Sequence, residues 1–398
     1  MGKKFVLVLD LGTTGVKSLL FDGELNLICR DYRPIRTIRR SGGRVEQSPE
    51  QMIVESKRVL TRVLEHSETP AERISALAIT NQRETILVWD RLSNKALYPA
   101  IVWEDKRTAG ACREIAARRG RFVRELTGLE VSSYFSAPEL MWLIKREKAI
   151  RHAAGDDRLA FGTVDSWLLR NLAEGAPHFT DQTNASRTLL YNIRTLDWDK
   201  RLLDIFGVPE NCLPAVRPSA SFYGTLRQEV VGARIPIMAV CGDQQAGVYA
   251  ALELANRVCP SRGVTKATYG TGCFVNQTLG AEFKLVPGFY TTLVPNPCGQ
   301  PNFCLEAKFD PCGSLVAPHL GNPKKLEGVL RLIARRADKI IRRLPTRPKE
   351  LIIDGGVTRS ARLRELQAEI SGIKVKSQPI WDGTALGAAH LALDALAK

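Results

Sequence analysis

A turn rich in glycine and threonine follows the first apolar segment, and it strongly constrains how this chain can fold. Phe5–Leu9 is apolar and rich in β-formers, and Asp10 comes directly after it. Gly12-Thr13-Thr14-Gly15 then separates this run from a second one at Val16–Phe21, which predicts a hairpin of two strands. Such a turn exposes successive backbone N–H groups, and these can bind an anion together with the threonine hydroxyls.

Phosphate is one candidate ligand for this turn, and an ordinary tight hairpin is the alternative. The spacing in Gly12–Ser18 differs from both the P-loop of NTPases and the dinucleotide turn Gly-x-Gly-x-x-Gly. Lys17 can bring a positive charge to a phosphate, and Asp10 can reach a metal ion directly or through water.

A second copy of the same pattern favours the phosphate hypothesis. Lys266–Phe283 again reads as a strand, the turn Gly270-Thr271-Gly272 and a returning strand. Repetition of a whole unit predicts two similar domains that face one ligand. We expect residues 1–252 to form the first domain, for substrate and phosphate, and residues 253–398 to form the second, for the nucleotide.

Composition narrows the class of protein. The chain of 398 residues is long enough for two domains, and 44% hydrophobic with 25% charged residues is typical of globular proteins. The first apolar run is too short for a signal peptide, and no stretch suits a membrane span. The nine cysteines include no C-x-x-C pair, which favours reduced thiols. These features predict a cytoplasmic protein without a membrane partner.

The formal charge of +15 raises the question of a nucleic-acid partner. Arginine pairs recur in segments with helical spacing, such as Arg335-Arg336 and Arg342-Arg343. Because the chain lacks aromatic interleaving and any recognisable nucleic-acid-binding motif, we expect a solvated basic face and no nucleic acid.

Charged residues gather where two predicted strands end, which is where α/β folds bind ligands. Ile74–Ile79 leads to Arg83 and Glu84, and Ile235–Cys241 leads to Asp243 and Gln244. The alternatives are an exposed ion pair for the first two and a helix N-cap for Asp243. Trp103 could be part of the core or a flat apolar wall of a site.

Two helix boundaries carry clear signals. Ser48 followed by Pro49 and Gln51 predicts an N-cap with proline at the first helical position. A second helix is expected over Thr108–Arg119, ended by Gly120.

With these segments in hand, the chain resembles the FGGY carbohydrate kinases, and most closely their glycerol branch. Its N-Q-R-E-T and W-x-D-x-R patterns are those of that branch. The stretches that carry the resemblance are LDLGTTGVKSLLFD, ITNQRETILVWD, AIVWEDKRT, SSYFS, FGTVDSWLL, TDQTNASRTLLYNI, CGDQQAG, ATYGTGCF and DGGV with TALGAA.

The resemblance implies an α/β fold with two actin/hexokinase-like (ribonuclease H-like) ATPase domains around a cleft. It implies ATP- and Mg2+-dependent phosphorylation of glycerol to sn-glycerol 3-phosphate, with Asp243 as the general base, and it leaves a homo-oligomer open. The implied polyol-binding residues are Arg83, Glu84, Trp103, Tyr134, Asp243 and Gln244. The implied nucleotide-binding residues are Thr13, Thr14, Gly15, Lys17, Thr271, Gly272, Gly356 and Ser360, with Asp10 at the metal.

The chain departs from the family pattern at several positions. Lys17 stands where arginine is usual, and Ser360 stands where asparagine is common. A long insertion usual between Gly313 and Leu326 is absent, as is an extended C-terminal tail. Two alternatives therefore stay open: a kinase for another small polyol or sugar, and a catalytically weak protein that binds nucleotide or polyol.

Overall fold

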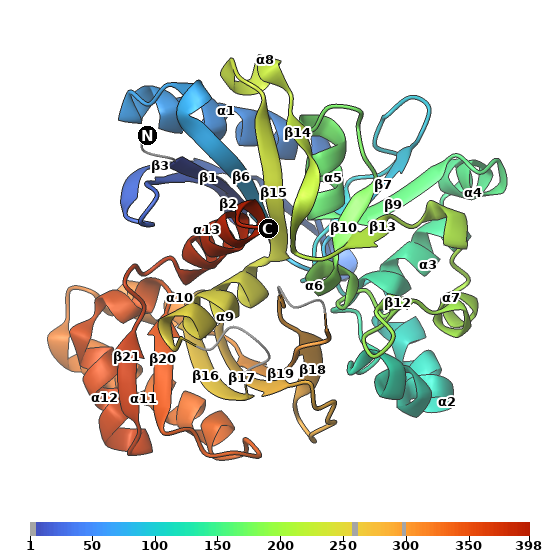
Figure 1. The fold of residues 1–398 in the computed structure, drawn as a ribbon. Helices are drawn as coiled ribbons and strands as arrows, with labels where there is room; N and C mark the ends of the chain where they lie inside the picture. Colours follow the sequence, from blue (N-terminus) through green and yellow to red (C-terminus); the bar gives the residue numbers. More distant parts are fainter. Residues whose placement is uncertain (1–4, 257–261, 297–299) are drawn as a thin grey trace. The chain divides into compact units, whose positions relative to one another are not determined.

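The computed structural model describes residues 5–256, 262–296 and 300–398. The chain divides into two compact units (Figure 1). Unit 1 comprises Met1–Asp243 and Ala388–Lys398, and unit 2 comprises Gln244–Gly387. The last helix of the chain therefore begins in unit 2 and ends in unit 1.

The main sheet of unit 1 has six strands in the order β14-β15-β6-β1-β2-β3. The predicted hairpin is confirmed, because β1 pairs antiparallel with β2 and Asp10 lies opposite Lys17. β6 and β15 extend the sheet in parallel with β1 on its other side. The strands are β1 Phe5–Leu11, β2 Gly15–Phe21, β3 Leu27–Pro34, β6 Ile74–Asn81, β14 Ala220–Leu226 and β15 Ile235–Gly242.

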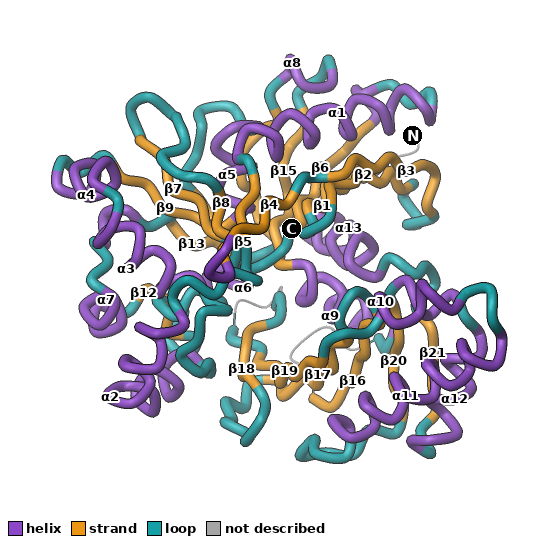
Figure 2. The backbone as a smooth tube through the Cα atoms, turned by 180° about the vertical axis from the view of Figure 1, so that it is seen from behind, coloured by secondary structure: helices purple, strands orange, loops and turns teal. Residues whose placement is uncertain are grey.

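A second sheet in unit 1 has the order β4-β5-β8-β7-β9, and Figure 2 shows β4 and β5 from behind. One apolar core joins both sheets through side chains such as Leu7, Leu77 and Trp89, with helices α1 (Pro49–Ser67) and α5 (Val164–Leu172) packed on it. The strands are β4 Thr37–Arg40, β5 Arg44–Gln47, β7 Ile86–Asp90, β8 Ala100–Ile101 and β9 Leu159–Thr163. Short strands follow at β10 Phe179–Asp181, β11 Tyr191–Asn192, β12 Asp197–Trp198 and β13 Ala215–Arg217.

The helices of unit 1 confirm one predicted boundary and correct another. Helix α1 begins at Pro49, and the Ser48 side chain accepts a hydrogen bond from the Gln51 N–H, as predicted. Helix α2 does not end at Gly120 but continues to Thr127, with Gly128 in the left-handed conformation as its cap. The helices are α1 Pro49–Ser67, α2 Ala109–Thr127, α3 Ser136–Arg146, α4 Lys148–Gly155, α5 Val164–Leu172, α6 Gln182–Ala185, α7 Lys200–Phe206 and α8 Gln228–Val231.

Unit 2 has its own six-stranded sheet in the order β18-β19-β17-β16-β20-β21. The strands are β16 Arg262–Tyr269, β17 Cys273–Gly280, β18 Tyr290–Leu293, β19 Phe303–Phe309, β20 Glu350–Asp354 and β21 Lys374–Ser377. Its helices are α10 Gly313–Val316, α11 Pro323–Ile341 and α12 Ala361–Ser371, together with α9 Asp243–Leu254 after its first residue and the first part of α13 Gly383–Leu396.

The two main sheets share one topology. In unit 1, β1, β2 and β3 form antiparallel pairs, and β6 and then β15 follow in parallel on the other side of β1. In unit 2, β16, β17 and β19 are arranged in the same way, followed by β20 and β21. This is the strand order of the ribonuclease H-like fold, so the predicted α/β fold class is confirmed in each unit.

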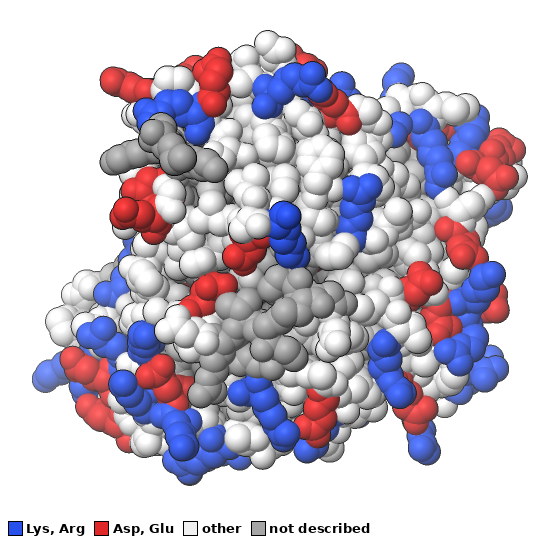
Figure 3. All heavy atoms as spheres, in the orientation of Figure 1, with Lys and Arg blue, Asp and Glu red and all other residues white. Residues whose placement is uncertain are grey.

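Acidic partners balance much of the arginine-rich surface of α11 and α12, where blue and red atoms are interspersed (Figure 3). Arg362 pairs with Glu327, Glu365 and Glu369, at 2.9 to 3.0 Å. These ion pairs are what a solvated helical face is expected to carry. Within the described part of the chain, no helix is both long and apolar enough to cross a membrane.

Candidate active site

The first glycine-threonine turn is held tightly by its neighbours. The Gly12 N–H donates to the Gly15 carbonyl at 2.9 Å, which closes the turn. A Cβ atom on Gly15 would lie 2.5 Å from the Arg33 carbonyl oxygen and from the Tyr32 ring, so a side chain at this position would need a backbone shift. The Tyr32 hydroxyl donates to the Thr14 carbonyl at 3.0 Å. The turn is therefore preorganised.

Two charged groups flank this turn, as the sequence predicts. Lys17 Nζ lies 3.0 Å from Asp10 Oδ2, and Asp10 is almost fully buried. The described residues contain no group of three or more acidic, histidine or cysteine side chains that could hold a metal ion. Mg2+ usually keeps several waters and binds one or two carboxylates plus substrate phosphates. A single carboxylate at Asp10 fits a metal held in that way.

The ends of β6 and β15 bring the predicted polyol residues together. The two strands pair in parallel, with Gly242 opposite Asn81, so the residues that follow them meet at one edge of the sheet. Arg83 Nε lies 3.3 Å from Asp243 Oδ1 and 3.9 Å from Glu84 Oε1. Arg83 and Glu84 are buried, whereas the Asp243 side chain is 30% exposed. A carboxylate that a ligand can reach thus lies beside a buried cation.

The backbone at Glu84 is specialised for this position. Its φ of 64° lies in the left-handed region, which is uncommon for a residue with a side chain. Its carbonyl accepts a hydrogen bond from the Ser136 hydroxyl at 2.9 Å. Backbone outliers of this kind cluster at functional sites, where the surrounding structure holds them.

Trp103 and Tyr134 form an aromatic wall at the turn. Their ring centroids are 5.5 Å apart and meet edge to face. The Trp103 Nε1–H donates to the Thr13 hydroxyl at 2.9 Å, so the indole is anchored to the turn. An anchored indole presents a fixed apolar surface, which suits the carbon side of a small polyol.

The W-x-D-x-R pattern has a structural role that its sequence did not reveal. Asp105 accepts hydrogen bonds from the Val45 N–H at 2.7 Å and from Arg107 Nη2 at 2.8 Å. Arg107 Nη2 also donates to Glu46 Oε1 at 2.7 Å, and these carboxylates raise the Arg107 pKa against the effect of burial. Asp105 and Arg107 thereby connect strand β5 to the loop that carries Trp103.

Strand β5 in turn supports the glycine-threonine turn. The Gln47 side chain donates from Nε2 to the Thr13 carbonyl at 2.7 Å. Its Oε1 accepts from Gln82 Nε2 at 2.8 Å. Two successive residues of β5 therefore connect the two ends: Glu46 binds Arg107, and Gln47 binds the Thr13 carbonyl.

Arg187 is a site residue that sequence reasoning missed. It is fully buried, and its Nε donates to Glu84 Oε1 at 2.5 Å. Its guanidinium carbon lies 5.7 Å from the centre of the Tyr134 ring and 5.1 Å from that of Phe135. Arg187 thus contacts two predicted polyol residues at once. Its place in the TDQTNASRTLLYNI stretch was the available signal, but only the fold shows its partners.

Unit 2 carries the second glycine turn between β16 and β17. The Gly270 N–H donates to the Gly272 carbonyl at 3.0 Å, as in the first turn. A Cβ atom on Gly272 would collide with the Asp310 carboxylate, so the backbone is bare at this point. Thr271 lies between these glycines, and its carbonyl accepts from the Cys312 N–H at 2.9 Å.

The predicted adenosine residues lie at the end of β20. Gly355 has a φ of 97°, and a Cβ atom on it would lie 2.5 Å from the Tyr269 carbonyl oxygen. Gly356 has open space around its Cα, and Ser360 is the N-cap residue of α12. Gln244 is the second residue of α9 and is buried. The ligand-binding roles of Gly356, Ser360 and Gln244 remain predictions.

Sequence reasoning also missed a buried ion pair between strands β16 and β20. Lys266 Nζ lies 3.0 Å from Asp354 Oδ2, and both side chains are almost fully buried. Burial raises the Asp354 pKa, while the neighbouring Lys266 charge opposes that rise. Gly247 and Gly383 leave room for the pair, because a Cβ atom on either would clash with it.

The sequence matches the N-terminal domain of the FGGY family of carbohydrate kinases over residues 5–250. The chain therefore belongs to the FGGY carbohydrate kinases.

Within that family it is similar to proteins named glycerol kinase. The protein from Shewanella woodyi is 32% identical, with 98% of this chain and 90% of the relative covered. The relative from Aeromonas hydrophila is 40% identical over 306 residues, and there the match spans 76% of this chain and 60% of the relative. The crystal structure of Plasmodium falciparum glycerol kinase with ADP has a TM-score of 0.89 at 26% identity, covering 98% of this chain and 90% of that one.

Proposed function

We propose that this protein transfers the γ-phosphoryl group of ATP to glycerol and releases ADP and sn-glycerol 3-phosphate. The observation that carries the proposal is the Asp243 carboxylate, partly exposed and 3.3 Å from Arg83 at the joined ends of two parallel strands. The glycerol kinases named above support glycerol as the substrate, because this chain is similar to them over nearly its whole length.

In this proposal the residues of unit 1 hold the polyol. Arg83 donates to glycerol oxygens, Glu84 accepts from a hydroxyl, and Trp103 packs on the carbon chain. Asp243 accepts the proton of the attacking hydroxyl as its oxygen bonds to phosphorus and the bond to the ADP oxygen breaks. Tyr134 and Gln244 complete the predicted set.

The nucleotide phosphates are assigned to the two glycine turns. Thr13, Thr14, Gly15 and Lys17 would hold them in unit 1, and Thr271 and Gly272 in unit 2. Gly356 and Ser360 would lie at the adenosine. Asp10 would hold Mg2+, which when bound neutralises charge on the phosphates. A cytoplasmic location and a homo-oligomeric state stay predictions.

The Asp243→Asn variant tests the proposal. Asparagine keeps the size of the side chain but cannot accept the proton as a carboxylate does. We expect a folded variant whose turnover falls by about 10²–10⁴-fold, the usual effect of removing a general base. ADP release should be measured with glycerol, dihydroxyacetone, erythritol and xylulose, beside a thermal melt of each protein. If the Asn variant kept most of the wild-type turnover, Asp243 would not be the general base.

The same assay separates the two alternatives. Faster turnover with another polyol than with glycerol would identify that polyol as the substrate. A wild type that binds glycerol and ATP without turnover would be a binding protein.

A further inference from the structure

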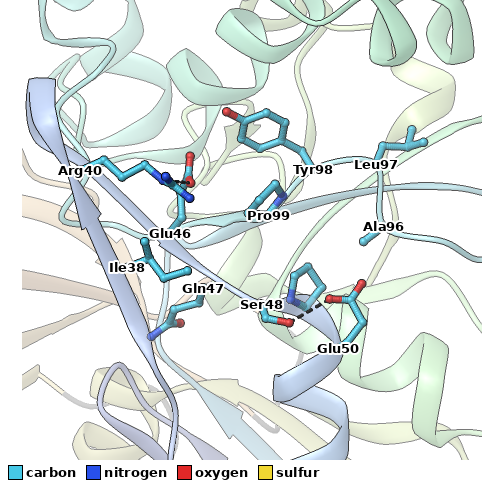
Figure 4. A pocket seen from close by; sticks show the side chains of 11 residues that line it. Ile38, Arg40, Glu46, Gln47, Ser48, Glu50, Ala96, Leu97, Tyr98 and Pro99 are labelled. Atoms are coloured by element: carbon cyan, nitrogen blue, oxygen red, sulfur yellow. Dashed lines mark hydrogen bonds and ion pairs between the residues drawn. The ribbon is translucent and has the colours of Figure 1, made fainter.

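The β4–β5 hairpin of unit 1 carries a basic hollow that the proposed reaction does not use. Its volume is about 480 Å3, and it is lined by Arg40, Ser41, Gly42, Arg44, Arg107 and Trp142. A neighbouring hollow of about 300 Å3 shares Arg40 with it. Figure 4 shows this neighbour, with Arg40 directed at Glu46 and the ring of Tyr98 close by. We call the first of the two the arginine hollow.

The arginine hollow has more cations than carboxylates. Arg40 Nε lies 3.6 Å from Glu46, and Arg107 uses the same Glu46 at 2.7 Å together with Asp105 at 2.8 Å. Arg44 has no carboxylate within ion-pair distance in the described part of the chain. Three guanidinium groups thus line the arginine hollow, whereas only two carboxylates, Glu46 and Asp105, pair with any of them, and both carboxylates are buried.

The surrounding groups add to this excess of positive charge. Lys106 lies against the turn between β4 and β5, because its backbone N–H donates to the Gly43 carbonyl at 2.9 Å. Like Arg44, Lys106 has no ion-pair partner among the described residues. The Trp142 ring has guanidinium carbons of Arg44 and Arg107 at 5.8 and 5.0 Å from its centre. The guanidinium groups are therefore held near one aromatic surface.

We propose that the arginine hollow binds a small organic phosphate through Arg40 and Arg44. Guanidinium groups match phosphate oxygens in a fork geometry, and a phosphate monoester carries about −1.5 to −2 charge at pH 7. Among the described residues, neither Arg44 nor Lys106 forms an ion pair that would compete with such a ligand, although the charge of Lys106 also acts on the buried Glu139 carboxyl. Arg40 is 60% exposed and can turn from Glu46 to a ligand.

A ligand bound in the arginine hollow could affect the glycine-threonine turn through strand β5. Arg40 and Arg107 both contact Glu46 on β5, and the next residue, Gln47, donates to the Thr13 carbonyl. A phosphate that competes with Glu46 for these arginines would alter the strand that supports Thr13. We therefore expect a bound phosphate to change the KM for ATP, a part of the inference that rests on the proposed function.

The binding itself can be followed without any activity. The chain has six tryptophans, and a spectrum of their 15N-labelled indole groups separates them. Trp142→Phe identifies the signal from the arginine hollow, and Trp103→Phe identifies the one at the glycine-threonine turn. Inorganic phosphate is titrated into the full chain, with chloride at equal ionic strength to control for screening.

We expect the Trp142 signal to shift and saturate with phosphate. The double variant Arg40→Gln/Arg44→Gln should weaken this binding about tenfold or more, as expected for lost hydrogen bonds to a charged group. Arg36→Gln, an exposed position on the same edge that does not line the hollow, should bind as the wild type does. A Trp142 response that chloride reproduces, or one that persists in the double variant, would overturn the proposal.

The kinetic arm tests the link to Thr13 separately. Phosphate should change the KM for ATP in the wild type beyond any effect that remains in the double variant. An unchanged KM while the Trp142 signal titrates would reject the link and keep the binding site. If the protein fails to phosphorylate glycerol, the Trp142 titration still decides the binding.

Discussion

Arg83 Nε lies 3.3 Å from Asp243 Oδ1, although β6 and β15, the strands that these residues follow, are far apart in sequence. The parallel pairing of these strands places Arg83 and Asp243 at one edge of the sheet. A buried guanidinium next to a partly exposed carboxylate holds that carboxylate in one orientation. Any ligand hydroxyl that reaches Asp243 therefore meets Arg83 as well.

Arg83→Ala should remove this contact and so test how much Arg83 contributes to glycerol binding. We expect a loss of about 2–5 kcal/mol in glycerol binding, the usual cost of removing one partner of a desolvated charged contact. Calorimetry with glycerol measures it. Arg58→Ala, which removes an exposed arginine paired with Glu55, is the matched control and should bind normally. Unchanged binding in Arg83→Ala would contradict the assignment.

Arg187 should act on the same site through Glu84. Arg187→Met leaves the buried Glu84 carboxylate without this partner, so we expect the free energy of unfolding to fall by about 3–5 kcal/mol. The KM for glycerol should rise by about tenfold to a hundredfold through misplacement of Glu84, with little change in the KM for ATP.

Two further variants distinguish positioning from stability at Arg187. Arg187→Lys keeps a positive charge and should recover part of the glycerol affinity. The double variant Arg187→Met/Glu84→Gln removes both charges and should regain stability without regaining affinity. If the double variant also restored a normal KM for glycerol, Arg187 would be only a structural partner.

Gly15→Ala tests the rigidity of the glycine-threonine turn. The added Cβ would lie 2.5 Å from the Arg33 carbonyl oxygen, so the backbone must shift. We expect a loss of about 1–3 kcal/mol in the free energy of unfolding, together with weaker ATP binding. Urea unfolding and nucleotide titration measure the two effects.

Gly120→Ala is the matched control for this variant. Its Cβ would meet only the Ala116 side chain at 3.7 Å within helix α2, so it should raise stability by about 0.5–1 kcal/mol. Equal effects at Gly15 and Gly120 would show that the tight contact at Gly15 does not matter.

Asp165 predicts a pH dependence of stability. Burial raises its pKa from 3.8 to about 7, helped by the nearby Asp181 charge. Thr163 and Thr180 donate hydrogen bonds to it at 2.5 and 2.7 Å, which oppose the rise. The folded state therefore binds the proton more tightly than the unfolded state, and this contribution to stability is present below pH 3.8 and is lost as the pH rises to about 7.

Asp165→Asn mimics the protonated form and should abolish this contribution. The difference in free energy of unfolding between variant and wild type should grow in favour of the variant from about pH 4 to pH 7, by a few kcal/mol. Urea unfolding over this range measures it. A difference that stays constant with pH would show that Asp165 does not titrate there.

The sequence by itself determined the local features of this protein. The two glycine turns with their hairpins, the Ser48 cap of α1 and the repeated strand pattern depend on neighbouring residues, so they could be read from short stretches. The adjacent Arg83 and Glu84 were found in the same way. Gly120 shows the limit, because helix α2 continues through it where packing outweighs the weak preference of glycine.

Only the tertiary structure decided which distant side chains meet. Nothing in the sequence pairs Arg187 with Glu84, Arg107 with Glu46, or Lys266 with Asp354. Each of these contacts joins different elements across a buried space, and a buried charge is tolerated only where the fold supplies a partner. Residue type and spacing along the chain do not contain that information, because strand order and register set which side chains face one another.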